Sequence, residues 1–578
     1  MKQHNISFWC SLYLAGLILL FIGCFVKAWV LQVKQFKDHT NYKKKITSSY
    51  ITIRTPRGKI LDQRGDPLAL SVRVYSCCMY PQMVSKDADK RQLARTLSRV
   101  LHLPFNKTIK KFNSTSKFRW VKRILTKYEE QKIRQLKKDG FGFIDLVAEY
   151  KRRYPGSKSL SHVIGYTGVD DQGLAGLELT CNQWLSGKSY KIYMRRDNRG
   201  NKILQQLEEP PKQVRTKNVL LTIDSVIQTF TEDALYMMVE KFRPKSAVGL
   251  VYNIHNGDVL AMVSYPRFDN NRYKDYNMET MRNRAVNAIY EPGSTFKSFT
   301  FAAAFNEGLI KEDEMIDCGP GIWKFGPRTL RDSHACHTIS TENVLIKSSN
   351  IGTAKIAIKL GEQKLFQYLR DFGFGQKTHL GLTGEEYGIF NHVDKWTNHY
   401  SITSIPMGQE INVTPIQLVK AYGALANGGL MMKPRIIKQI VSEDGFVIQD
   451  WPPEIEKRVL KVETSKRVLR ILKKVVEEGT GKNARSDLYD IGGKTGTSQK
   501  IVNGAYSKTQ HVGSFIGIAP INNPKIVVLV VLDDPLGKGY GGTVAAPAVK
   551  LIIENSLQYL NVPPDKIILS ENEIEREQ

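Results

Sequence analysis

The sequence is poor in cysteine. Its 578 residues contain 7 cysteines, and Cys10 and Cys24 fall within an apolar run near the N-terminus. The other five are an odd and scattered set, which excludes the disulfide framework that holds small secreted domains together. They are Cys77, Cys78, Cys181, Cys318 and Cys336.

The nearest approach to a metal motif is the sequence His-Ala-Cys-His at 334–337, with Cys318 upstream. This cluster has neither the C-x-x-C nor the H-E-x-x-H spacing that is typical of zinc sites. We therefore interpret 334–337 as a polar loop and expect no metal there.

Acidic side chains are scarce relative to basic ones: 56 Asp and Glu stand against 84 Lys and Arg, which gives a formal net charge of +28. Such a charge suits an acidic partner, namely nucleic acid, an anionic membrane surface or a polymer that carries carboxylates. The sequence lacks zinc-finger spacing, a helix-turn-helix pattern and an RNP-like motif, so we expect no nucleic-acid partner. The length predicts at least two domains.

One hydrophobic run is long enough to cross a bilayer. Residues 8–26 carry no charge, and Trp9 and Trp29 stand near the two ends as interfacial anchors. A cleaved signal peptide is the alternative, but the run is long for that purpose and no clear small-x-small cleavage site follows it. We predict a tail at 1–7 and a membrane-spanning helix at 8–30.

The orientation of this helix is ambiguous from charge alone. Lys2 is the only basic side chain before the span, whereas several lysines follow it, so a positive-inside count would leave the body in the cytoplasm. Long translocated domains can disregard that count, and the chemistry described below favours the opposite orientation.

The rest of the chain changes pattern near residue 215. Residues 51–80 alternate and contain turn residues, which predicts short strands, and 86–138 is helical, with leucines four residues apart at Leu93, Leu97 and Leu101. A polar stretch containing two prolines at 207–224 then leads into an apolar strand and is the best candidate boundary.

Beyond this boundary, β-rich segments lie at both ends of a long helical region. Residues 246–266 form two β-rich runs joined at Asn256-Gly257, and another hairpin surrounds 522–524, followed by a helix at 545–560. This order predicts an α+β domain in which the first and last strands share one antiparallel sheet.

A serine and a lysine begin a helix after Pro292 and Gly293. Ser294 and Lys297 are three residues apart and so lie on one face, and the free backbone N–H groups of a first helical turn can stabilise negative charge. Taken alone the spacing is weak, because Ser114 and Lys117 repeat it without supporting context, and helix capping explains it equally well.

Two further segments carry polar groups that point to the same chemistry. Ser348-Ser349-Asn350 interrupts two helical stretches and can face a cleft, although a simple turn is the ordinary explanation. Lys494-Thr495-Gly496-Thr497 lies on a β-like segment and is not a Walker A loop, because Leu488 occupies the position of the required glycine. A strand edge with small residues can accept a bound chain as an added strand.

In the order S-x-x-K, S-x-N and K-T-G, these segments resemble the active site of the penicillin-recognising serine acyltransferases. Residues 291–310, 408–429, 492–500 and 513–520 resemble class B penicillin-binding proteins, particularly the FtsI type that cross-links septal peptidoglycan. Residues 56–65, 152–157 and 173–179 resemble the membrane-proximal pedestal of that family. One departure is visible: the family's Asp-Arg-x-Gly is Asp62-Gln63-Arg64-Gly65 here, which puts the ion pairing of the pedestal in doubt.

The resemblance implies an α+β fold with a single N-terminal transmembrane helix, an elongated mixed α/β pedestal at 31–215, a transpeptidase domain at 216–565 and a polar tail at 566–578. The transpeptidase domain would combine an antiparallel sheet packed with helices and an all-helical subdomain. The implied catalytic residues are Ser294, Lys297, Ser348, Asn350 and Lys494, and the implied substrate-binding residues are Thr495, Gly496 and Thr497. The implied oxyanion hole consists of the backbone N–H groups of Ser294 and Thr497, and no metal or cofactor is needed.

The expected activity is a D,D-transpeptidase that cross-links stem peptides ending in D-Ala-D-Ala through a serine acyl-enzyme and is acylated by β-lactams. Its substrate lies outside the cytoplasmic membrane, so we expect the body to be extracytoplasmic and to work with a glycosyltransferase and other division proteins. The alternatives are an elongation-type transpeptidase, a hydrolytic carboxypeptidase or β-lactamase relative, and a non-catalytic division scaffold.

Overall fold

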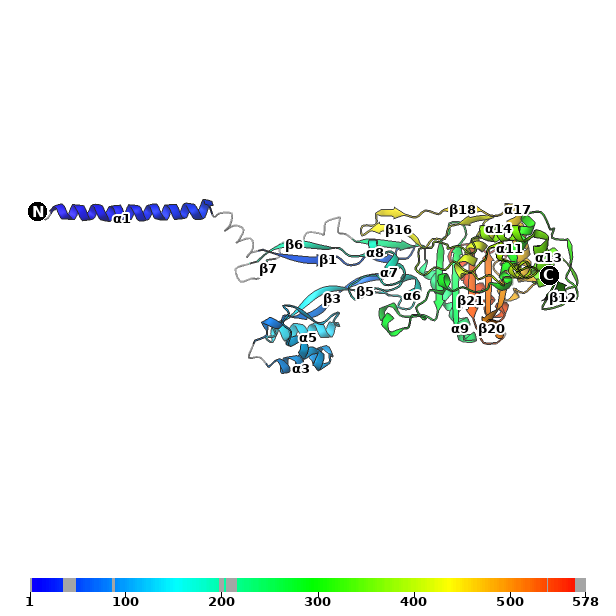
Figure 1. Ribbon diagram of the computed structural model, residues 1–578, viewed down its shortest axis with the longest axis horizontal. Helices are drawn as coiled ribbons and strands as arrows, with labels where there is room; N and C mark the ends of the chain where they lie inside the picture. Colours follow the sequence, from blue (N-terminus) through cyan, green and yellow to red (C-terminus); the bar gives the residue numbers. More distant parts are fainter. Residues whose placement is uncertain are drawn as a thin grey trace, which may run out of the picture. The chain divides into compact units, whose positions relative to one another are not determined.

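The computed structural model describes residues 3–34, 48–85, 89–196, 202–203, 216–537 and 539–566 (Figure 1). Its contacts divide the chain into two units, 1–55 with 187–215 and 56–186 with 216–578. The predicted tail beyond 566 and part of the predicted boundary, 207–215, lie outside the described residues.

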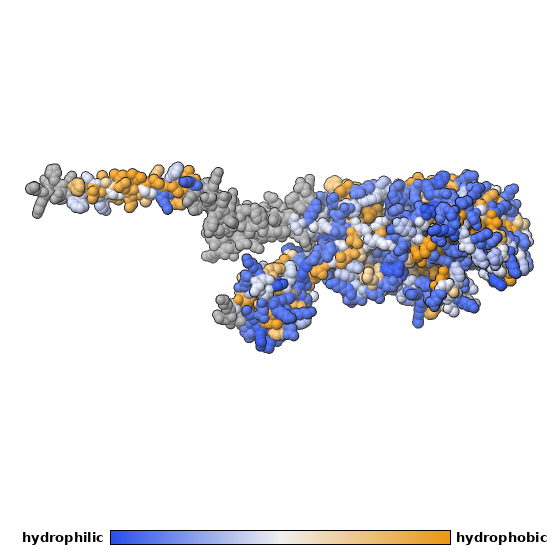
Figure 2. All heavy atoms as spheres, in the orientation of Figure 1, coloured by the Kyte–Doolittle hydropathy of each residue, from blue (hydrophilic) through white to orange (hydrophobic). Residues whose placement is uncertain are grey.

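The first unit contains the predicted membrane span. The helix α1 (Gln3–Trp29) continues into the short π-helix η1 (Val30–Lys34). Large apolar side chains such as Leu19 and Phe21 are 69% and 75% exposed, and Figure 2 shows the apolar surface along α1. Among the described residues, one helix, which covers Phe8–Lys34, is long enough and apolar enough to cross a membrane. The same unit holds an antiparallel sheet of β1 (Ser48–Arg54), β6 (Ser189–Arg196) and β7 (Lys202–Ile203).

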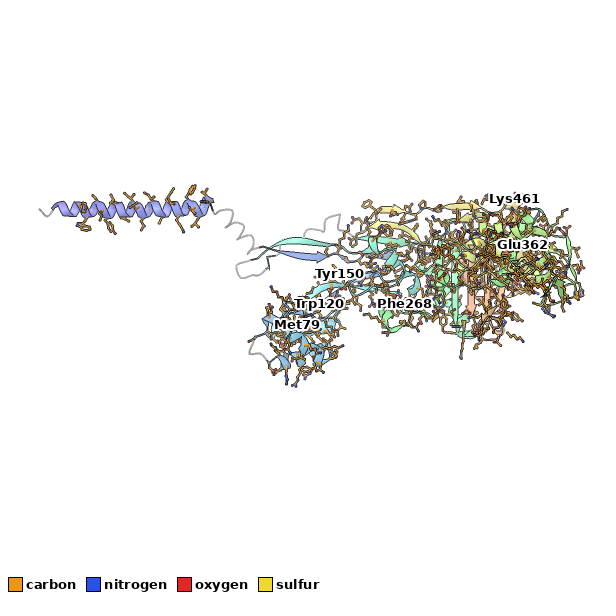
Figure 3. All side chains as sticks on the ribbon, viewed as in Figure 1. Met79, Trp120, Tyr150, Phe268, Glu362 and Lys461 are labelled. Carbon is orange, nitrogen blue, oxygen red and sulfur yellow. The ribbon has the colours of Figure 1, made fainter. Side chains whose placement is uncertain are left out.

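The second unit begins with the lobe formed by residues 67–153. Long strands β3 (Pro67–Met79) and β5 (Ile144–Arg153) pair antiparallel, and β4 (Arg119–Lys122) extends the sheet. Helices α3 (Lys90–Leu101), α4 (Phe105–Phe112) and α5 (Lys127–Lys138) pack on it (Figure 3, near Met79 and Trp120). The helical pattern predicted for 86–138 is thus interrupted by β4.

Local sequence explains where these helices begin. The Asp89 side chain accepts hydrogen bonds from the backbone N–H groups of Arg91 and Gln92 and caps α3. Thr126 and Glu129 form a reciprocal capping box at the start of α5. The buried leucines of α3 then complete a small core of their own.

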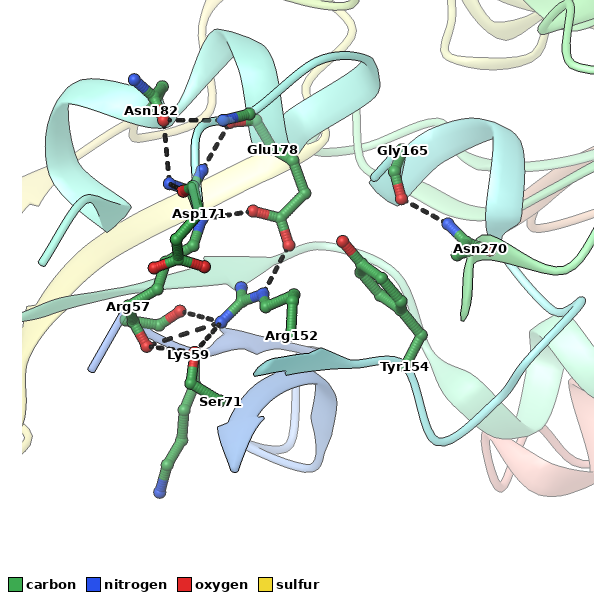
Figure 4. A network of polar contacts seen from close by, with 12 residues as sticks. Arg57, Lys59, Ser71, Arg152, Tyr154, Gly165, Asp171, Glu178, Asn182 and Asn270 are labelled. Carbon is green, nitrogen blue, oxygen red and sulfur yellow. Dashed lines mark hydrogen bonds and ion pairs between the residues drawn. The ribbon is translucent and has the colours of Figure 1, made fainter. Parts of the chain in front are cut away.

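A buried ion triad holds the base of the pedestal together (Figure 4). Glu178 accepts from Arg57 Nε and from Arg152 Nε, both at 2.6 Å, and the side chains of all three residues are 0–2% exposed. The two guanidinium groups also donate to backbone carbonyls, including Arg57 to Glu178 O at 2.6 Å and Arg152 to Gly58 O at 2.7 Å. The three motifs at 56–65, 152–157 and 173–179 therefore meet at one carboxylate.

Removal of this carboxylate charge should destabilise the pedestal strongly. Glu178→Gln leaves two buried guanidinium groups without a counter-ion, and we expect a loss of about 3–5 kcal/mol in the free energy of unfolding. Differential scanning calorimetry and limited proteolysis measure this loss. Glu130→Gln is the matched control, because Glu130 pairs with Arg134 at 2.7 Å on the surface of α5 and should contribute about 0.5 kcal/mol or less. Equal effects of the two changes would contradict the role of the triad.

The departure at Asp62-Gln63-Arg64-Gly65 has a structural resolution. Gln63 donates to Asp224, and Arg64 lies 3.8 Å from the same carboxylate and over the Tyr559 ring. Asp62 accepts from the Ser225 hydroxyl at 2.7 Å. Arg64, one position after Gln63, thus lies near the Asp224 carboxylate, and the Arg57–Glu178–Arg152 triad provides buried ion pairing in the pedestal.

The residues from 216 onward, expected from the sequence to form the transpeptidase domain and called the catalytic part below, are built on a five-stranded antiparallel sheet with the order β10-β9-β21-β20-β19. This confirms the prediction that the first and last strands share one sheet. The strands are β9 (Ser246–Asn253), β10 (Val259–Tyr265), β19 (Gly492–Val502), β20 (Ala505–Ala519) and β21 (Ile526–Asp533). Strand β19 lies at the edge of the sheet.

Helices cover both faces of this sheet. The helices α9 (Ser225–Phe242) and α19 (Ala546–Tyr559) share one hydrophobic core with it. The other core contains α11 (Lys297–Asn306), α13 (Asn350–Leu360), α16 (Pro415–Ala426) and α17 (Val462–Glu477). Two small antiparallel pairs, β11 (Met315–Asp317) with β14 (Thr338–Ser340) and β12 (Ile322–Phe325) with β13 (Arg328–Arg331), accompany these helices.

A second sheet, with the order β17-β16-β8-β2-β3-β4, joins the pedestal to the catalytic part. Strand β8 (Lys217–Leu221) pairs with β2 (Ile60–Leu61) on one side and with β16 (Ile437–Ser442) on the other, while β17 (Val447–Asp450) forms its edge. Because strands from both parts share one ladder, the pedestal and the catalytic part are hydrogen-bonded to each other.

Candidate active site

The helical segment that follows Pro292 begins with a tight turn. Residues Gly293–Phe296 form the 3-10 turn η5, and α11 continues from Lys297. Gly293 has φ +56, and a Cβ at this position would meet Thr497 O at 2.8 Å. Only glycine can therefore bring the half-buried Ser294 this close to β19.

Helix α11 is buried along almost its whole length, in agreement with its largely apolar sequence Lys-Ser-Phe-Thr-Phe-Ala-Ala-Ala-Phe. Phe296 and Phe299 pack against Phe374, with ring centroids 4.7 and 5.1 Å apart. The Tyr422 hydroxyl donates to Thr295 O at 2.6 Å. The serine and lysine thus stand on a rigid, packed element, which favours fixed geometry in a reacting group.

Lys297 is fully buried and makes three polar contacts. Its Nζ donates to Ser348 O at 2.5 Å, to Asn350 Oδ1 at 2.8 Å and to Ser348 Oγ at 3.2 Å. Burial lowers the pKa of Lys297 to about 7, and the nearby charge of Asp332 opposes this shift only in part. A lysine with this pKa is substantially neutral at physiological pH and can accept a proton.

Ser348 stands at the break between α12 (Thr341–Ile346) and α13, in a left-handed backbone conformation with φ 59. It presents its hydroxyl to Lys494 as well as to Lys297, and Lys494 Nζ lies 3.1 Å from Ser348 Oγ. Ser349 plays a different part, because its hydroxyl caps α13 by accepting from Gly352 N at 3.0 Å. Ser348 and Asn350 therefore contact Lys297, while Ser349 between them caps the helix.

Asp332 is a site residue that sequence reasoning missed. Its carboxylate accepts from the Ser349 hydroxyl at 2.6 Å and from the backbone N–H groups of Asn350 and Ile351 at the start of α13. It thereby fixes the turn that carries Ser348 and Asn350. No local pattern marks Asp332, because its partners lie 17–19 residues further along the chain.

Lys494 is the second buried amine of the site. It is 0% exposed, and burial together with the charge of Lys297 lowers its pKa well below that of an ordinary lysine. The two lysines approach one hydroxyl from different elements, α11 and β19. Two ammonium groups in one dry site repel each other, so the pair favours states in which one of them has lost its proton.

The strand that carries Lys494 lies directly against the serine turn. A Cβ on Gly496 would meet Pro292 O at 2.8 Å, so this glycine permits the contact between β19 and η5. The Thr495 hydroxyl lies 2.8 Å from that of Thr480, and Thr497 Oγ1 accepts from Gly541 N at 3.2 Å. Because β19 is an edge strand, its outer side can pair with an extended ligand.

The residues named from sequence thus meet in one place, with Ser348 Oγ hydrogen-bonded to lysines from two distant segments. A serine on the first turn of a buried helix, two amines of lowered pKa and a strand at the edge of the described sheet, on an α+β fold, are typical of the class of penicillin-recognising serine enzymes.

Comparisons with known proteins agree with this class. Residues 247–554 match the family described as the Penicillin binding protein transpeptidase domain, and residues 52–221 match the Penicillin-binding Protein dimerisation domain. The chain belongs to the penicillin-binding protein transpeptidase family, in the form that carries a dimerisation-type pedestal.

Several relatives extend along nearly the whole chain. It is 32% identical to the "Probable peptidoglycan D,D-transpeptidase PenA" of Neisseria meningitidis, over 96% of this chain and 93% of the relative. It is 34% identical to the "Stage V sporulation protein D" of Bacillus subtilis (93% and 82% covered) and 29% identical to the "Peptidoglycan D,D-transpeptidase FtsI" of Escherichia coli (89% and 85% covered). Penicillin binding protein 3 of Mycobacterium tuberculosis, solved with aztreonam, matches with a TM-score of 0.69 and 26% identity over 89% of this chain and 98% of that chain.

Proposed function

We propose that this protein is a membrane-anchored peptidoglycan D,D-transpeptidase that cross-links stem peptides through an acyl-enzyme on Ser294. The observation that carries the proposal is the pair of buried amines on one hydroxyl, Lys297 and Lys494 at 3.2 and 3.1 Å from Ser348 Oγ. With its pKa lowered to about 7, Lys297 can accept and return a proton at neutral pH, which is what serine acyl transfer requires.

In the proposed acylation, Lys297 takes the proton of the Ser294 hydroxyl while its oxygen attacks the carbonyl carbon of the penultimate D-Ala. The bond between Ser294 Oγ and that carbon forms, and the bond from the carbon to the terminal D-Ala nitrogen breaks. Ser348 relays a proton to the departing amine, and Asn350 orients both Lys297 and the peptide amide. The backbone N–H groups of Ser294 and Thr497 would hold the oxyanion, and the contact of Gly293 with Thr497 supports this role.

In the proposed second step, the amine nitrogen of a neighbouring stem peptide attacks the ester carbon and forms the cross-linking amide bond. The bond from that carbon to Ser294 Oγ breaks, and the proton that the amine loses passes through Ser348 and Lys297 to Ser294 Oγ. Lys494, Thr495 and Thr497 would hold the terminal carboxylate of the donor, and Gly496 would let its backbone approach β19. β-Lactams would enter the first step and remain on Ser294, because their leaving group stays tethered.

The proposed arrangement of the chain follows from this substrate. We assign 1–7 to the cytoplasm, 8–30 to the membrane, 31–215 to the pedestal, 216–565 to the transpeptidase domain and 566–578 to a polar tail. The body would lie outside the cytoplasmic membrane, where its net charge of +28 suits an anionic wall polymer and membrane surface. A reporter fused after residue 578 that is active only in the cytoplasm would contradict this topology.

The proposed activity is tested by letting water and an acceptor amine compete for the acyl group on the enzyme. The full chain in detergent is incubated with a pentapeptide stem ending in D-Ala-D-Ala and with a D-amino acid as acceptor, and products are separated by liquid chromatography and mass spectrometry. We expect release of D-Ala with the acceptor attached to the donor, in proportion to acceptor concentration. Formation of the hydrolysed tetrapeptide at a rate independent of the amine concentration would indicate a carboxypeptidase. Formation of neither the tetrapeptide nor the acceptor-linked peptide would indicate a non-catalytic scaffold.

We assign the cross-linking to septal synthesis, in association with a glycosyltransferase and other division proteins. The resemblance of the motifs to the FtsI type supports this assignment, and one relative carries the FtsI name. Another relative is named a stage V sporulation protein, so a role outside division is the alternative. Depletion of the protein in its own cells should give filaments without septa, whereas rounded cells would favour an elongation role.

A further inference from the structure

Glu291 is a buried carboxylate next to the reactive serine, and the proposed acyl transfer does not use it. It precedes Ser294 by three residues and is 8% exposed. Its Oε1 accepts the Glu410 backbone N–H at 3.0 Å and the Tyr506 hydroxyl at 3.0 Å. Its Oε2 is buried without a hydrogen-bond partner among the described residues, so both contacts depend on one oxygen atom.

The two donors come from distant parts of the fold. Tyr506 lies at the tip of the β19–β20 hairpin, where it pairs with Ile501, and the same hairpin carries Lys494 and the Thr497 edge. Glu410 follows Gly408, whose carbonyl accepts from Gly293 N at 3.1 Å. One carboxylate oxygen therefore fastens the hairpin and the 408–410 turn to the segment that ends in Ser294.

Packing alone does not hold the hairpin tip. Ile501, Val502 and Tyr506 are 57%, 40% and 42% exposed. A cavity of about 280 Å³ lies behind the tip, lined among others by Tyr290, Glu291, Gln499, Lys500 and Ile501. Two further polar side-chain contacts connect the hairpin to the region around β21, the ion pair between Lys500 and Asp533 at 2.6 Å and the hydrogen bond from Gln510 to Asp534 at 2.9 Å.

The surroundings of Glu291 are polar and include a second carboxylate, Glu410. Burial raises the pKa of Glu291, and the Glu410 charge raises it further, while the hydrogen bonds from Glu410 N and Tyr506 oppose the shift. Arg328, on β13, lies within electrostatic reach of Glu410 and Tyr506 and donates to Tyr400 O at 2.5 Å. The backbone carbonyl of Arg331, on the same strand, accepts a hydrogen bond from Asn350 at 2.8 Å. Strand β13 therefore connects the surroundings of Glu291 to Asn350.

We propose that Glu291 and Tyr506 form a latch that sets the position of the β19–β20 hairpin relative to Ser294, and hence the fit of the donor peptide or β-lactam along β19. Glu291 is a positioning residue in this inference, since it acts through the hairpin and not on the reacting atoms. The inference rests on the proposed acylation of Ser294. Loss of the latch loosens the border of the site and weakens noncovalent binding, and it leaves the proton transfers by Lys297 and Ser348 intact.

Stopped-flow acylation with a chromogenic cephalosporin separates these effects, because the dependence of the rate on concentration gives the dissociation constant and the limiting rate of acylation independently. Tyr506→Phe removes one hydrogen bond to a carboxylate and should raise the dissociation constant about fivefold, with the limiting rate within about twofold of the parent protein. Glu291→Ala should raise the dissociation constant at least as much, and Glu291→Gln, which keeps a carbonyl acceptor, should recover most of the loss.

The double variant Glu291→Ala with Tyr506→Phe should bind no more weakly than Glu291→Ala alone, because the two side chains act through one bond. Tyr387→Phe is the matched control, an exposed tyrosine of the catalytic part that should leave both constants unchanged. Additive losses in the double variant, or a lower limiting rate with unchanged binding, would overturn the latch. Failure of the parent protein to be acylated would instead overturn the proposed function.

Discussion

Ser294→Ala should lower the rate of covalent labelling by a fluorescent penicillin by about 10⁴-fold or more, because no other group can form the ester. The substitution removes a single oxygen from a half-buried side chain, so the free energy of unfolding should change by about 1 kcal/mol or less. Gel fluorescence measures the labelling, and mass spectrometry of the parent protein should find the adduct on the peptide that contains residue 294.

The chain supplies a matched control for this experiment. Ser114 and Lys117 have the same S-x-x-K spacing, but Ser114 lies in the pedestal, where its hydroxyl accepts from Arg119 Nε at 2.9 Å, and Lys117 is exposed. Ser114→Ala should therefore label like the parent protein. An adduct that persists in Ser294→Ala, on any other residue, would rule out the assigned nucleophile.

The acylation rate should rise about tenfold from about pH 6 to about pH 8, with an apparent pKa near that of Lys297. Burial lowers the pKa of Lys297 to about 7, so the neutral amine, which is the form that accepts the serine proton, grows as the pH rises through this value. The measurement is the second-order rate constant for acylation as a function of pH. A profile that is flat or falls over this range would contradict the role of Lys297 as the base.

Two variants separate the charge of Lys297 from its basicity. Lys297→Arg keeps a positive charge and hydrogen-bond donors but cannot lose its proton, so acylation should fall by about 10³-fold or more at every pH. Asp332→Asn removes a negative charge that raises the pKa of Lys297, so the rise of the acylation rate with pH should occur at lower pH. A rise that moves to higher pH would show that another group controls the profile.

The sequence was most informative where a feature is local. The apolar helix near the N-terminus and the helix that carries Leu97 and Leu101 follow from apolar spacing within a few residues, and both were predicted. The helical pattern at 86–138 did not reveal β4, because a four-residue strand is stabilised by its pairing with β3 and carries little signal of its own.

Only part of the candidate active site could be predicted from the sequence. Spacing within the turn explains why Ser294 and Lys297 belong together, and the resemblance of the three motifs linked them to Ser348, Asn350 and Lys494. Asp332 and Glu291 escaped notice because nothing near them in the chain distinguishes them from surface carboxylates.

The amino-acid sequence by itself therefore determined the membrane helix, the class of fold and the family to which the chain belongs, since these depend on composition, periodicity and short motifs. Only the tertiary structure decided that Lys297 and Lys494 share the Ser348 hydroxyl, that Glu178 joins two arginines, and that Glu291 holds the hairpin. Burial creates the lowered pKa of Lys297, and burial is a property of the packed chain, because it depends on neighbours that lie far away in the sequence.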